Sequence, residues 1–498
     1  MLFSIAFVTF SSLFVLYVWR YYEKVRRYPR GPLPYPVVGN LLSYDWSKIH
    51  EEITKISKVY GTVFTVWLPR PSVVITDYRA IKEAFSTKGD DFSGRSGLFP
   101  NTIFQNIENG GVLEAQGENW TEQLAGVASI EGKDEIHLYQ PLQLFVGNII
   151  NQTLFGFRYD NDKCERLMTI VREMSELFSA MTSSPLTLLG QAFPIIYRLP
   201  IVGYIAKDRL CNMMCGTWRL IKEDVERALK SYSPDQEPEC MVQAYYQKMQ
   251  SNSNLDHDNL LSICMDFFLA GMETTTTTLR WSTLILAKHP EVQEKIRKEI
   301  LFVIGANGIP RTSYKPRMPY TCAAIMELQR FANIIPANAV HRTVRDTSVG
   351  EYRIPADTLV LGAIHQVLAH SPVYKDGHEF RPERFLMEDG ITANKEAVEQ
   401  FCPFSIGKRQ CAGEALARVE LFVGLVTLLQ HYEIEPVKAH PIDLESISGI
   451  VLSPKEQPLR LVPLTNREHL LFNFTRVLWI SLKVNLLIIQ LFVCLGQQ

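Results

Sequence analysis

The stretch "FSIGKRQCAG", Phe404 to Gly413, places one cysteine between two glycines and beside basic side chains. Gly407 and Gly413 would let the backbone turn tightly and approach a large, flat ligand closely. A helical pattern begins just after Cys411, and the positive N-terminal end of that helix would favour a thiolate on its sulfur. Arg409 adds positive charge that an anionic group of a bound molecule could meet. These ten residues therefore predict a site built around one sulfur atom.

Three roles compete for Cys411: a buried structural thiol, a catalytic nucleophile and a metal ligand. A nucleophile needs an adjacent base, and no histidine lies in the stretch. A single thiolate with no neighbouring second ligand suits an axial position on haem iron better than a zinc site. A structural thiol is the plain alternative, and the framing by glycines argues against it.

The composition is that of a large globular protein. The chain has 498 residues, of which 11% are aromatic and 21% charged, and no linker or repeat divides it, so we expect one large domain. The net charge of −2 gives no reason to expect a nucleic-acid partner. Nine scattered cysteines without a C-x-x-C pair, the closest being Cys211 and Cys215, favour reduced thiols facing the cytosol over a disulfide framework.

The N-terminus predicts a membrane anchor. Residues 1–19, "MLFSIAFVTFSSLFVLYVW", carry no charge and are about long enough to cross a bilayer as a helix. A cleaved signal peptide would need a basic segment before the apolar run and a small-residue cleavage site, and both are missing. The positive charges follow the apolar run instead, which puts the rest of the chain in the cytoplasm. These charges are Arg20, Lys24, Arg26, Arg27 and Arg30.

Two further segments border the predicted domain. Residues 20–40 form a basic, proline-rich hinge, "YPRGPLPYPVVGN" at its end, in which repeated X-Pro pairs keep the backbone extended. Residues 465–498 form an apolar C-terminal extension that contains Arg476 and Lys483. Each of these charges would cost roughly 3 kcal/mol in mid-bilayer, which favours an interfacial helix or a packed extension over a second span.

The interior of the chain reads as mainly helical with a minor sheet. "GTVFTVWLPRPSVVITD" predicts a β-hairpin turning at Pro69-Arg70-Pro71, and Pro290 could occupy the first turn of a helix. Long apolar helices are predicted for "DNLLSICMDFFLAGMETTTTTLRWSTLILAKH" and "EALARVELFVGLVTLLQHY".

Two other segments could carry chemistry. In "AGMETTTTT" five threonines follow Glu273, and they either widen a turn that exposes Glu273 and Thr274 to a cavity, or simply bond back to carbonyls one turn earlier. In "ELQR" Glu327 and Arg330 share a helix face, as solvated surface pairs often do. The "FRPERF" segment supplies Arg384, which could join that pair in a buried network.

Taken together and in this order, these segments resemble a cytochrome P450 of the microsomal, membrane-anchored type. "FSIGKRQCAG" matches the haem-binding signature of that family at every defined position. "AGMETT" is similar to its oxygen-binding helix, "ELQR" to its Glu-x-x-Arg motif and "FRPERF" to its Pro-Glu-Arg-Phe segment. The resemblance implies the mainly α cytochrome P450 fold, with residues 41–464 as the haem-thiolate catalytic domain behind the anchor.

The resemblance also implies a role for each site residue. Cys411 would be the axial thiolate ligand of haem b, shielded by Phe404 within the loop that Gly407 helps to shape. Arg409, His341 ("NAVHRTV"), Arg95 ("FSGRSG") and Trp120 would hold the haem propionates. Glu273 and Thr274 would supply protons during oxygen activation, and Glu327, Arg330 and Arg384 would form a structural triad.

The implied reaction is a monooxygenation. One oxygen atom from O2 would enter an apolar small molecule such as a xenobiotic, a fatty acid or a sterol, and the other would be reduced to water. Electrons would come from NADPH through a membrane-bound NADPH-cytochrome reductase, with cytochrome b5 as a candidate second partner. The implied location is the endoplasmic reticulum membrane, with the catalytic domain facing the cytoplasm. A haem-thiolate isomerase and a degenerate, non-catalytic haem or ligand binder are the alternatives.

One region departs from the family pattern. The family has an arginine four positions after the propionate-binding tryptophan, and Leu124 stands there after Trp120. The chain then runs almost at once into "LFVGNIINQTLFGFRYD", which resembles a helix lying well downstream in relatives. We therefore predict that the domain is shortened around residues 121–140, and that the loss weakens or abolishes haem binding. The C-terminal extension is a second departure, since family members usually stop near Leu464.

Overall fold

The computed structural model describes residues 2–45, 48–95, 138–159, 164–184, 187, 189–190, 193–230, 232–251, 255–437, 440–447 and 449–464. This part of the chain is mainly helical with small sheets, as the sequence predicts. Trp120, most of the segment predicted to be shortened, and the C-terminal extension from residue 465 lie outside the described residues.

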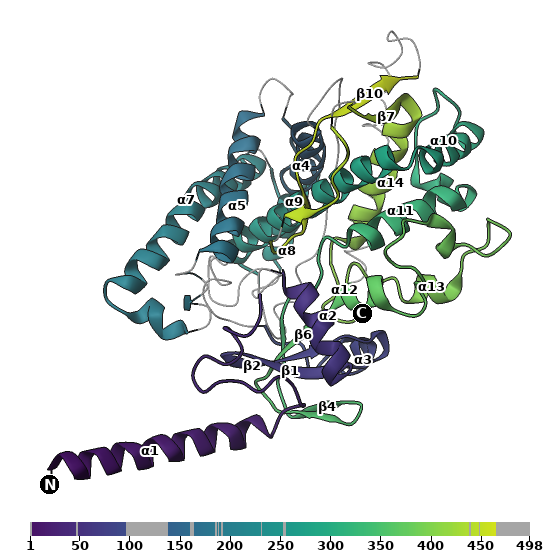
Figure 1. Cartoon of the computed structure of the whole chain (residues 1–498). Helices are drawn as coiled ribbons and strands as arrows, with labels where there is room; N and C mark the ends of the chain where they lie inside the picture. The colour runs from purple at the N-terminus through teal and green to yellow at the C-terminus, as the bar shows by residue number, and fades with distance from the viewer. Residues whose placement is uncertain are drawn as a thin grey trace. The chain divides into compact units, whose positions relative to one another are not determined.

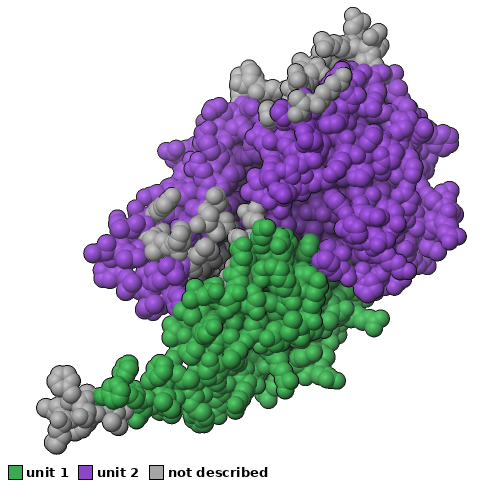
Figure 2. Space-filling view, viewed as in Figure 1, with its two compact units in different colours: residues 1–96, 336–367, 405–410 green, residues 97–335, 368–404, 411–498 purple. Residues whose placement is uncertain are grey.

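The chain divides into two compact units, which Figure 2 colours separately. Unit 1 contains residues 1–96, 336–367 and 405–410, and unit 2 contains residues 97–335, 368–404 and 411–498. Because the chain passes repeatedly from one unit to the other, neither unit corresponds to one continuous stretch of sequence.

Unit 1 is built around a mixed sheet of four strands in the order β1-β2-β6-β3. The predicted hairpin is confirmed: β1 and β2 pair antiparallel from Val63↔Ile75 to Leu68↔Arg70. β6 adds parallel to β2, and β3 pairs antiparallel with β6. The elements of unit 1 are α1 (Leu2–Val25), α2 (Ile49–Tyr60), β1 (Val63–Leu68), β2 (Arg70–Ile75), α3 (Tyr78–Lys82), the π-helical turn η2 (Glu83–Thr87), β3 (His341–Arg342), β4 (Thr347–Val349), β5 (Tyr352–Ile354) and β6 (Leu359–Gly362).

Strand β1 is buried along almost its whole length, and one face of the hairpin packs on a helix. Phe64, Val66 and Val74 pack against Ile53 and Ile56 of the amphipathic helix α2. Each fully buried side chain of this size contributes about 1.5–3 kcal/mol relative to an exposed one. The buried hairpin therefore fixes the positions of the segments at its two ends.

Helix α1 forms where the membrane anchor is predicted, and its last turns pack on the hairpin. The ring of Tyr21 lies 5.5 Å from that of Trp67, as does the ring of Tyr28. Further along the helix, Phe7 and Phe10 are largely exposed. The anchor itself is not confirmed, because no helix in the described part of the chain is long and apolar enough to cross a membrane.

Unit 2 is a helical assembly with short strand pairs, β7 with β10 and β8 with β9, both antiparallel. Helix α12 (Ile364–His370) begins in unit 1 and ends in unit 2. The other elements of unit 2 are α4 (Tyr139–Phe155), α5 (Glu165–Ser183), η6 (Pro194–Arg198), α7 (Val202–Leu229), α8 (Met241–Met249), α9 (His257–Lys288), α10 (Pro290–Val303), η7 (Thr312–Arg317), α11 (Pro319–Ala332), η8 (Pro382–Phe385), α13 (Lys395–Glu399), α14 (Glu414–His431), β7 (Tyr432–Pro436), β8 (Ser446–Ile447), β9 (Ser453–Pro454) and β10 (Leu459–Pro463).

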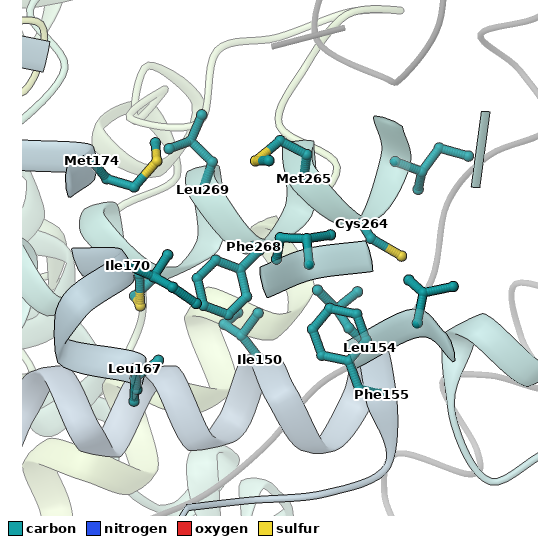
Figure 3. Packing of buried hydrophobic residues seen from close by; sticks show 14 of the residues in the cluster. Ile150, Leu154, Phe155, Leu167, Ile170, Met174, Cys264, Met265, Phe268 and Leu269 are labelled. Carbon is teal, nitrogen blue, oxygen red and sulfur yellow. The ribbon is translucent and has the colours of Figure 1, made fainter. Parts of the chain in front are cut away.

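The long helix α9 is the centre of unit 2, contacting α4, α7, α8, α10, α11 and α14 (Figure 1). The Asp256 carboxylate caps its start by accepting from the Asn259 N–H over 2.7 Å. One buried cluster joins side chains of α9, including Phe268 and Leu269, to side chains of α4 and α5 (Figure 3). A helix that is apolar on most sides is stable only when it is surrounded in this way.

The two other predicted helices are also confirmed. Pro290 occupies the first turn of α10, where its missing N–H costs nothing. Helix α14 starts at Glu414, directly after Gly413, so the cysteine stretch ends at a helix N-terminus as predicted.

Candidate functional site

The cysteine stretch forms a closed loop. The Cys411 N–H donates to the Phe404 carbonyl over 2.9 Å, and the Gln410 N–H donates to the Gly407 carbonyl over 3.0 Å. At Gly407 φ is +86°, and a Cβ added there would lie 1.8 Å from the Phe85 carbonyl oxygen. The glycine is therefore required by the protein's own main chain in unit 1, whereas the sequence had suggested the close approach of a ligand.

Cys411 is enclosed by protein and is still reached by solvent. Its side chain keeps accessible surface, yet the surrounding atoms are dense enough that burial raises the pKa of the thiol. The main-chain N–H groups of Gly413 and Glu414 lower that pKa, as predicted for the start of the next helix, but burial outweighs them. The thiolate form therefore needs another positive partner, and a coordinated metal ion is such a partner.

Phe404 is fixed beside the same sulfur-bearing loop. The Arg418 guanidinium lies 5.3 Å from the Phe404 ring and 5.7 Å from the Phe401 ring. Arg418 is held in turn by the Glu414 carboxylate, whose Oε1 accepts from Nε over 2.8 Å. The first turn of α14 thus orients the aromatic side chain at the start of the loop.

Three of the residues predicted to bind the haem propionates lie together in unit 1. Arg95 and Arg409 are 5% and 8% exposed, and His341 is 2% exposed. Arg409 donates to the Ser93 carbonyl through Nε and Nη2, over 3.1 and 2.9 Å, and His341 Nδ1 lies 2.8 Å from the Phe92 carbonyl oxygen. Burial and then the charges of both arginines lower the pKa of His341 to about 3. Positive charge is thus concentrated around a neutral imidazole, and because its one N–H, on Nδ1, bonds Phe92, its Nε2 can only accept a hydrogen bond.

Glu273 and Thr274, the predicted acid and alcohol, are consecutive residues of α9. Thr277 donates to the Glu273 carboxylate over 3.2 Å, and burial raises the pKa of Glu273. Thr274 donates to the Ala270 carbonyl over 2.7 Å, and Thr278 repeats this bond one turn later. The helix stays regular throughout the threonine run, so the widened turn is wrong and the back-bonding alternative is right.

Glu327, Arg330 and Arg384 form one buried network in unit 2. Arg330 donates to Glu327 through Nε and Nη2, over 2.7 and 2.9 Å, and Arg384 Nε donates to Glu327 Oε1 over 3.0 Å. Glu327 is 0% and Arg330 1% exposed, so this pair is not the solvated surface contact that its spacing alone allows. The remaining guanidinium N–H groups donate to main-chain oxygens of the segment that precedes η8.

Two residues near these groups were missed by the sequence analysis. Asn338 accepts from the Gly362 N–H over 2.8 Å and donates to the Ser405 hydroxyl over 3.5 Å, which ties β6 to the cysteine loop within unit 1. Glu420 on α14 is 2% exposed, and burial raises its pKa to about 8 against a hydrogen bond from Thr275. The sequence could have drawn attention to Glu420, because it is the one acid inside the apolar run "LARVELFVGL".

Comparison with known proteins gives consistent matches along the chain. The sequence model of the family described as Cytochrome P450 matches residues 29–128 and 126–461. Cytochrome P450 2F2 of Mus musculus is 35% identical over 459 residues, covering 84% of this chain and 91% of the relative. Cytochrome P450 2M1 of Oncorhynchus mykiss is 32% identical over 466 residues (85% and 90%), and cytochrome P450 2C8 of Homo sapiens is 32% identical over 501 residues (93% and 99%).

The family match is interrupted at one place. Its two parts meet at residues 126–128, inside the region predicted to be shortened. The alignment with the mouse relative also runs over more positions than 84% of a 498-residue chain can fill, so parts of that relative have no counterpart here. On either side of the interruption the match covers nearly the whole chain, and the chain belongs to the cytochrome P450 family of haem-thiolate monooxygenases.

Proposed function

We propose that this chain inserts one oxygen atom from O2 into an apolar small molecule, with electrons that originate from NADPH. The overall reaction consumes the substrate, O2, two electrons and two protons, and yields the hydroxylated product and one water molecule. The observation that carries the proposal is the loop of Cys411, a cysteine that keeps exposed surface although surrounding protein raises its pKa. Haem, when bound, would supply the one-electron and oxygen chemistry.

The residues present fit a haem group. Cys411 offers the single sulfur ligand, and the helix start behind it directs two N–H groups at that sulfur. The cluster of Arg95, Arg409 and His341 offers the buried positive charge of two guanidinium groups, which carboxylates bind. We assign Cys411 to the iron and this cluster to the propionates, with Phe404 limiting access of water to the sulfur. Trp120 is assigned to the propionates by the family resemblance.

The proton-handling residues would be Glu273 and Thr274. Burial keeps Glu273 protonated to a higher pH than an exposed glutamate, which suits a residue that holds and releases a proton. The Thr274 hydroxyl donates to Ala270, and its oxygen can still accept a hydrogen bond, for example from a water molecule. The network of Glu327, Arg330 and Arg384 would hold the main chain between α11 and η8 in place and take no part in the chemistry.

The partners and the location belong to the same proposal. The uncharged residues 1–19, followed by basic residues, support attachment to the endoplasmic reticulum membrane with the catalytic domain in the cytoplasm. A membrane-bound NADPH-cytochrome reductase would deliver the electrons, with cytochrome b5 as a second donor. We propose a xenobiotic, a fatty acid or a sterol as the class of substrate.

A second function is favoured by the interruption of the family match. Loss of a segment near residues 126–128 would remove one wall of the haem pocket and the arginine that normally follows the tryptophan. A chain altered in this way would bind haem weakly, and it would act as a membrane-anchored binder of haem or of an apolar ligand without turnover. An isomerase is disfavoured, because the acid–alcohol pair on α9 serves oxygen activation.

The absorbance spectrum of the reduced protein under carbon monoxide separates these functions. The full chain is expressed with its reductase, supplied with haem, reduced and exposed to carbon monoxide. A thiolate-type Soret shift at full haem loading would exclude the weak-binding alternative, and a complete absence of bound haem would exclude the enzyme. Cys411→Ser removes the shift if Cys411 is the ligand, whereas the matched variant Cys322→Ser leaves it unchanged. Reductase-dependent NADPH consumption coupled to product then distinguishes a monooxygenase from a binder.

A further inference from the structure

Two cysteines lie one turn apart on α7, at the border between its buried and exposed sides. Cys211 is half-buried and touches the apolar core of unit 2, and Cys215 is exposed. Side chains four residues apart meet on this side of the helix, because Asn212 Nδ2 donates to Asp208 Oδ2 over 3.0 Å. Cys211 and Cys215 have the same spacing and therefore face each other across one helical turn.

The pKa of the Cys211 thiol depends on burial and on its neighbours along α7. Burial raises the pKa of Cys211, the Lys207 ammonium lowers it, and the Cys215 thiol raises it again. Lys207, one turn towards the N-terminus, favours the thiolate that a bond to a soft acceptor requires.

The spacing of the pair excludes a relaxed disulfide. Side chains at i and i+4 of a helix have Cβ atoms about 5–6 Å apart, whereas a disulfide needs about 3.5–4.5 Å between them. A direct S–S bond would therefore distort the turn. An atom inserted between the two sulfurs lengthens the bridge and removes this conflict, so the pair is suited to chelation.

We propose that Cys211 and Cys215 form a chelating dithiol site for a soft acceptor that makes two bonds to sulfur, with trivalent organoarsenic as its representative. Within the described ranges there is no group of three or more His, Cys, Asp and Glu side chains that could hold a metal ion. The pair thus supplies two ligands, which suits such an acceptor better than a zinc ion that needs four.

Formation of the two As–S bonds requires no oxidant. An organoarsenic(III) oxide and two thiols give two As–S bonds and one molecule of water, and arsenic remains trivalent throughout. The oxide oxygen leaves with the two thiol protons. The product is a covalent staple across one turn of α7, independent of haem and of the monooxygenase reaction.

The test uses the reduced full-length chain and equimolar phenylarsine oxide. Peptide mapping by mass spectrometry should locate one arsenic atom bridging Cys211 and Cys215, and both thiols should lose their reactivity towards a maleimide. Ethane-1,2-dithiol should release the arsenic, whereas 2-mercaptoethanol at the same thiol concentration should not, because only a chelated arsenic resists a monothiol.

Matched variants make the test decisive. Cys215→Ser changes an exposed side chain and should abolish the monothiol-resistant arsenic, as should Cys211→Ser. Cys322→Ser should have no effect, because no other cysteine lies within four residues of position 322. Unchanged far-ultraviolet circular dichroism shows that each variant is folded. Two results would overturn the proposal. One is that 2-mercaptoethanol removes the arsenic as easily as ethane-1,2-dithiol does. The other is a bridge mapped to Cys240 and Cys264.

Discussion

Gly407 is the residue at which the cysteine loop depends most directly on the protein main chain. Its φ of +86° and the carbonyl oxygen of Phe85 leave no space for a Cβ. Gly390 has a similar φ of +69° and nothing within 4 Å of an added Cβ, so it carries the backbone strain without the clash.

We expect Gly407→Ala to destabilise the fold and to lower haem binding. At Gly390, alanine should cost about 1–2 kcal/mol from the left-handed backbone alone. At position 407 the clash should add about 1–3 kcal/mol, because the main chain around Phe85 must move. Urea unfolding of both variants measures the difference, and the haem-to-protein ratio reports on the loop. Equal losses at the two positions would show that the contact with Phe85 does not matter.

Glu327 compensates two buried cations. Removing its charge in Glu327→Gln leaves Arg330 and Arg384 buried with reduced compensation, which should cost about 3–5 kcal/mol of unfolding free energy. In the matched variant Glu294→Gln the altered side chain is half-exposed, Lys298 is exposed and Arg297 keeps Glu433 within 3.8 Å, so the cost should be about 1 kcal/mol or less. Chemical denaturation followed by circular dichroism gives both values, and a cost at Glu327 no larger than at Glu294 would contradict a structural role for the network.

At the residue scale, the sequence singled out individual side chains but could not predict their surroundings. The spacing in "FSIGKRQCAG" singled out Cys411 and Arg409 without any structure. It could not show that burial outweighs the helix start in setting the pKa of Cys411, since burial depends on segments distant in sequence. The same limit hid Asn338, whose two side-chain bonds reach Gly362 and Ser405.

At the scale of elements, the packing of α14 on α9 brings Glu420 against Thr275. Burial keeps the Glu420 carboxyl protonated in the folded protein up to a pKa of about 8, whereas the ordinary value is 4.5. A raised folded pKa means that the folded state holds the proton more tightly than the unfolded state. The stabilising contribution of the neutral carboxyl is therefore complete below pH 4.5 and is lost as the pH rises towards about 8.

Glu420→Gln should remove this dependence on pH. Between pH 5 and pH 8 the unfolding free energy of the variant should rise relative to that of the unaltered chain, by up to about 1.4 kcal/mol per pH unit. Denaturation at several pH values gives this difference directly. The exposed Glu388→Gln serves as the control and should give a difference that does not change with pH. A constant difference for Glu420→Gln as well would mean that the carboxyl is not held neutral.

Periodicity predicted elements where local signals and packing agreed. The β-branched runs on both sides of Pro69 gave the hairpin, and Pro290 marked the start of α10. The threonine run was ambiguous, because threonine disfavours helices by propensity but satisfies itself by bonding one turn back. Packing on all sides of α9 stabilises a regular helix here, and a local sequence pattern does not show which segments will pack around it.

At the scale of the whole molecule, haem binding and folding are linked. Any ligand that binds only the folded state stabilises it by RT ln(1 + [L]/Kd), which is about 2.7 kcal/mol at a concentration 100 times Kd. If the shortening predicted around residues 121–140 removes part of the haem pocket, this chain should have a higher Kd for haem, and it should therefore need more haem for the same stabilisation.

We expect the Tm of this chain to rise only at haem concentrations well above that of the protein. Cytochrome P450 2F2 of Mus musculus, purified in the same way, is the matched comparison and should reach its full shift near equimolar haem. Thermal unfolding at increasing haem concentrations gives both curves, and Cys411→Ala separates specific ligation from adsorption of haem to apolar surface. If the two proteins reach their full shifts at the same ratio of haem to protein, the shortened region does not limit binding, and the chain should turn over like its relatives.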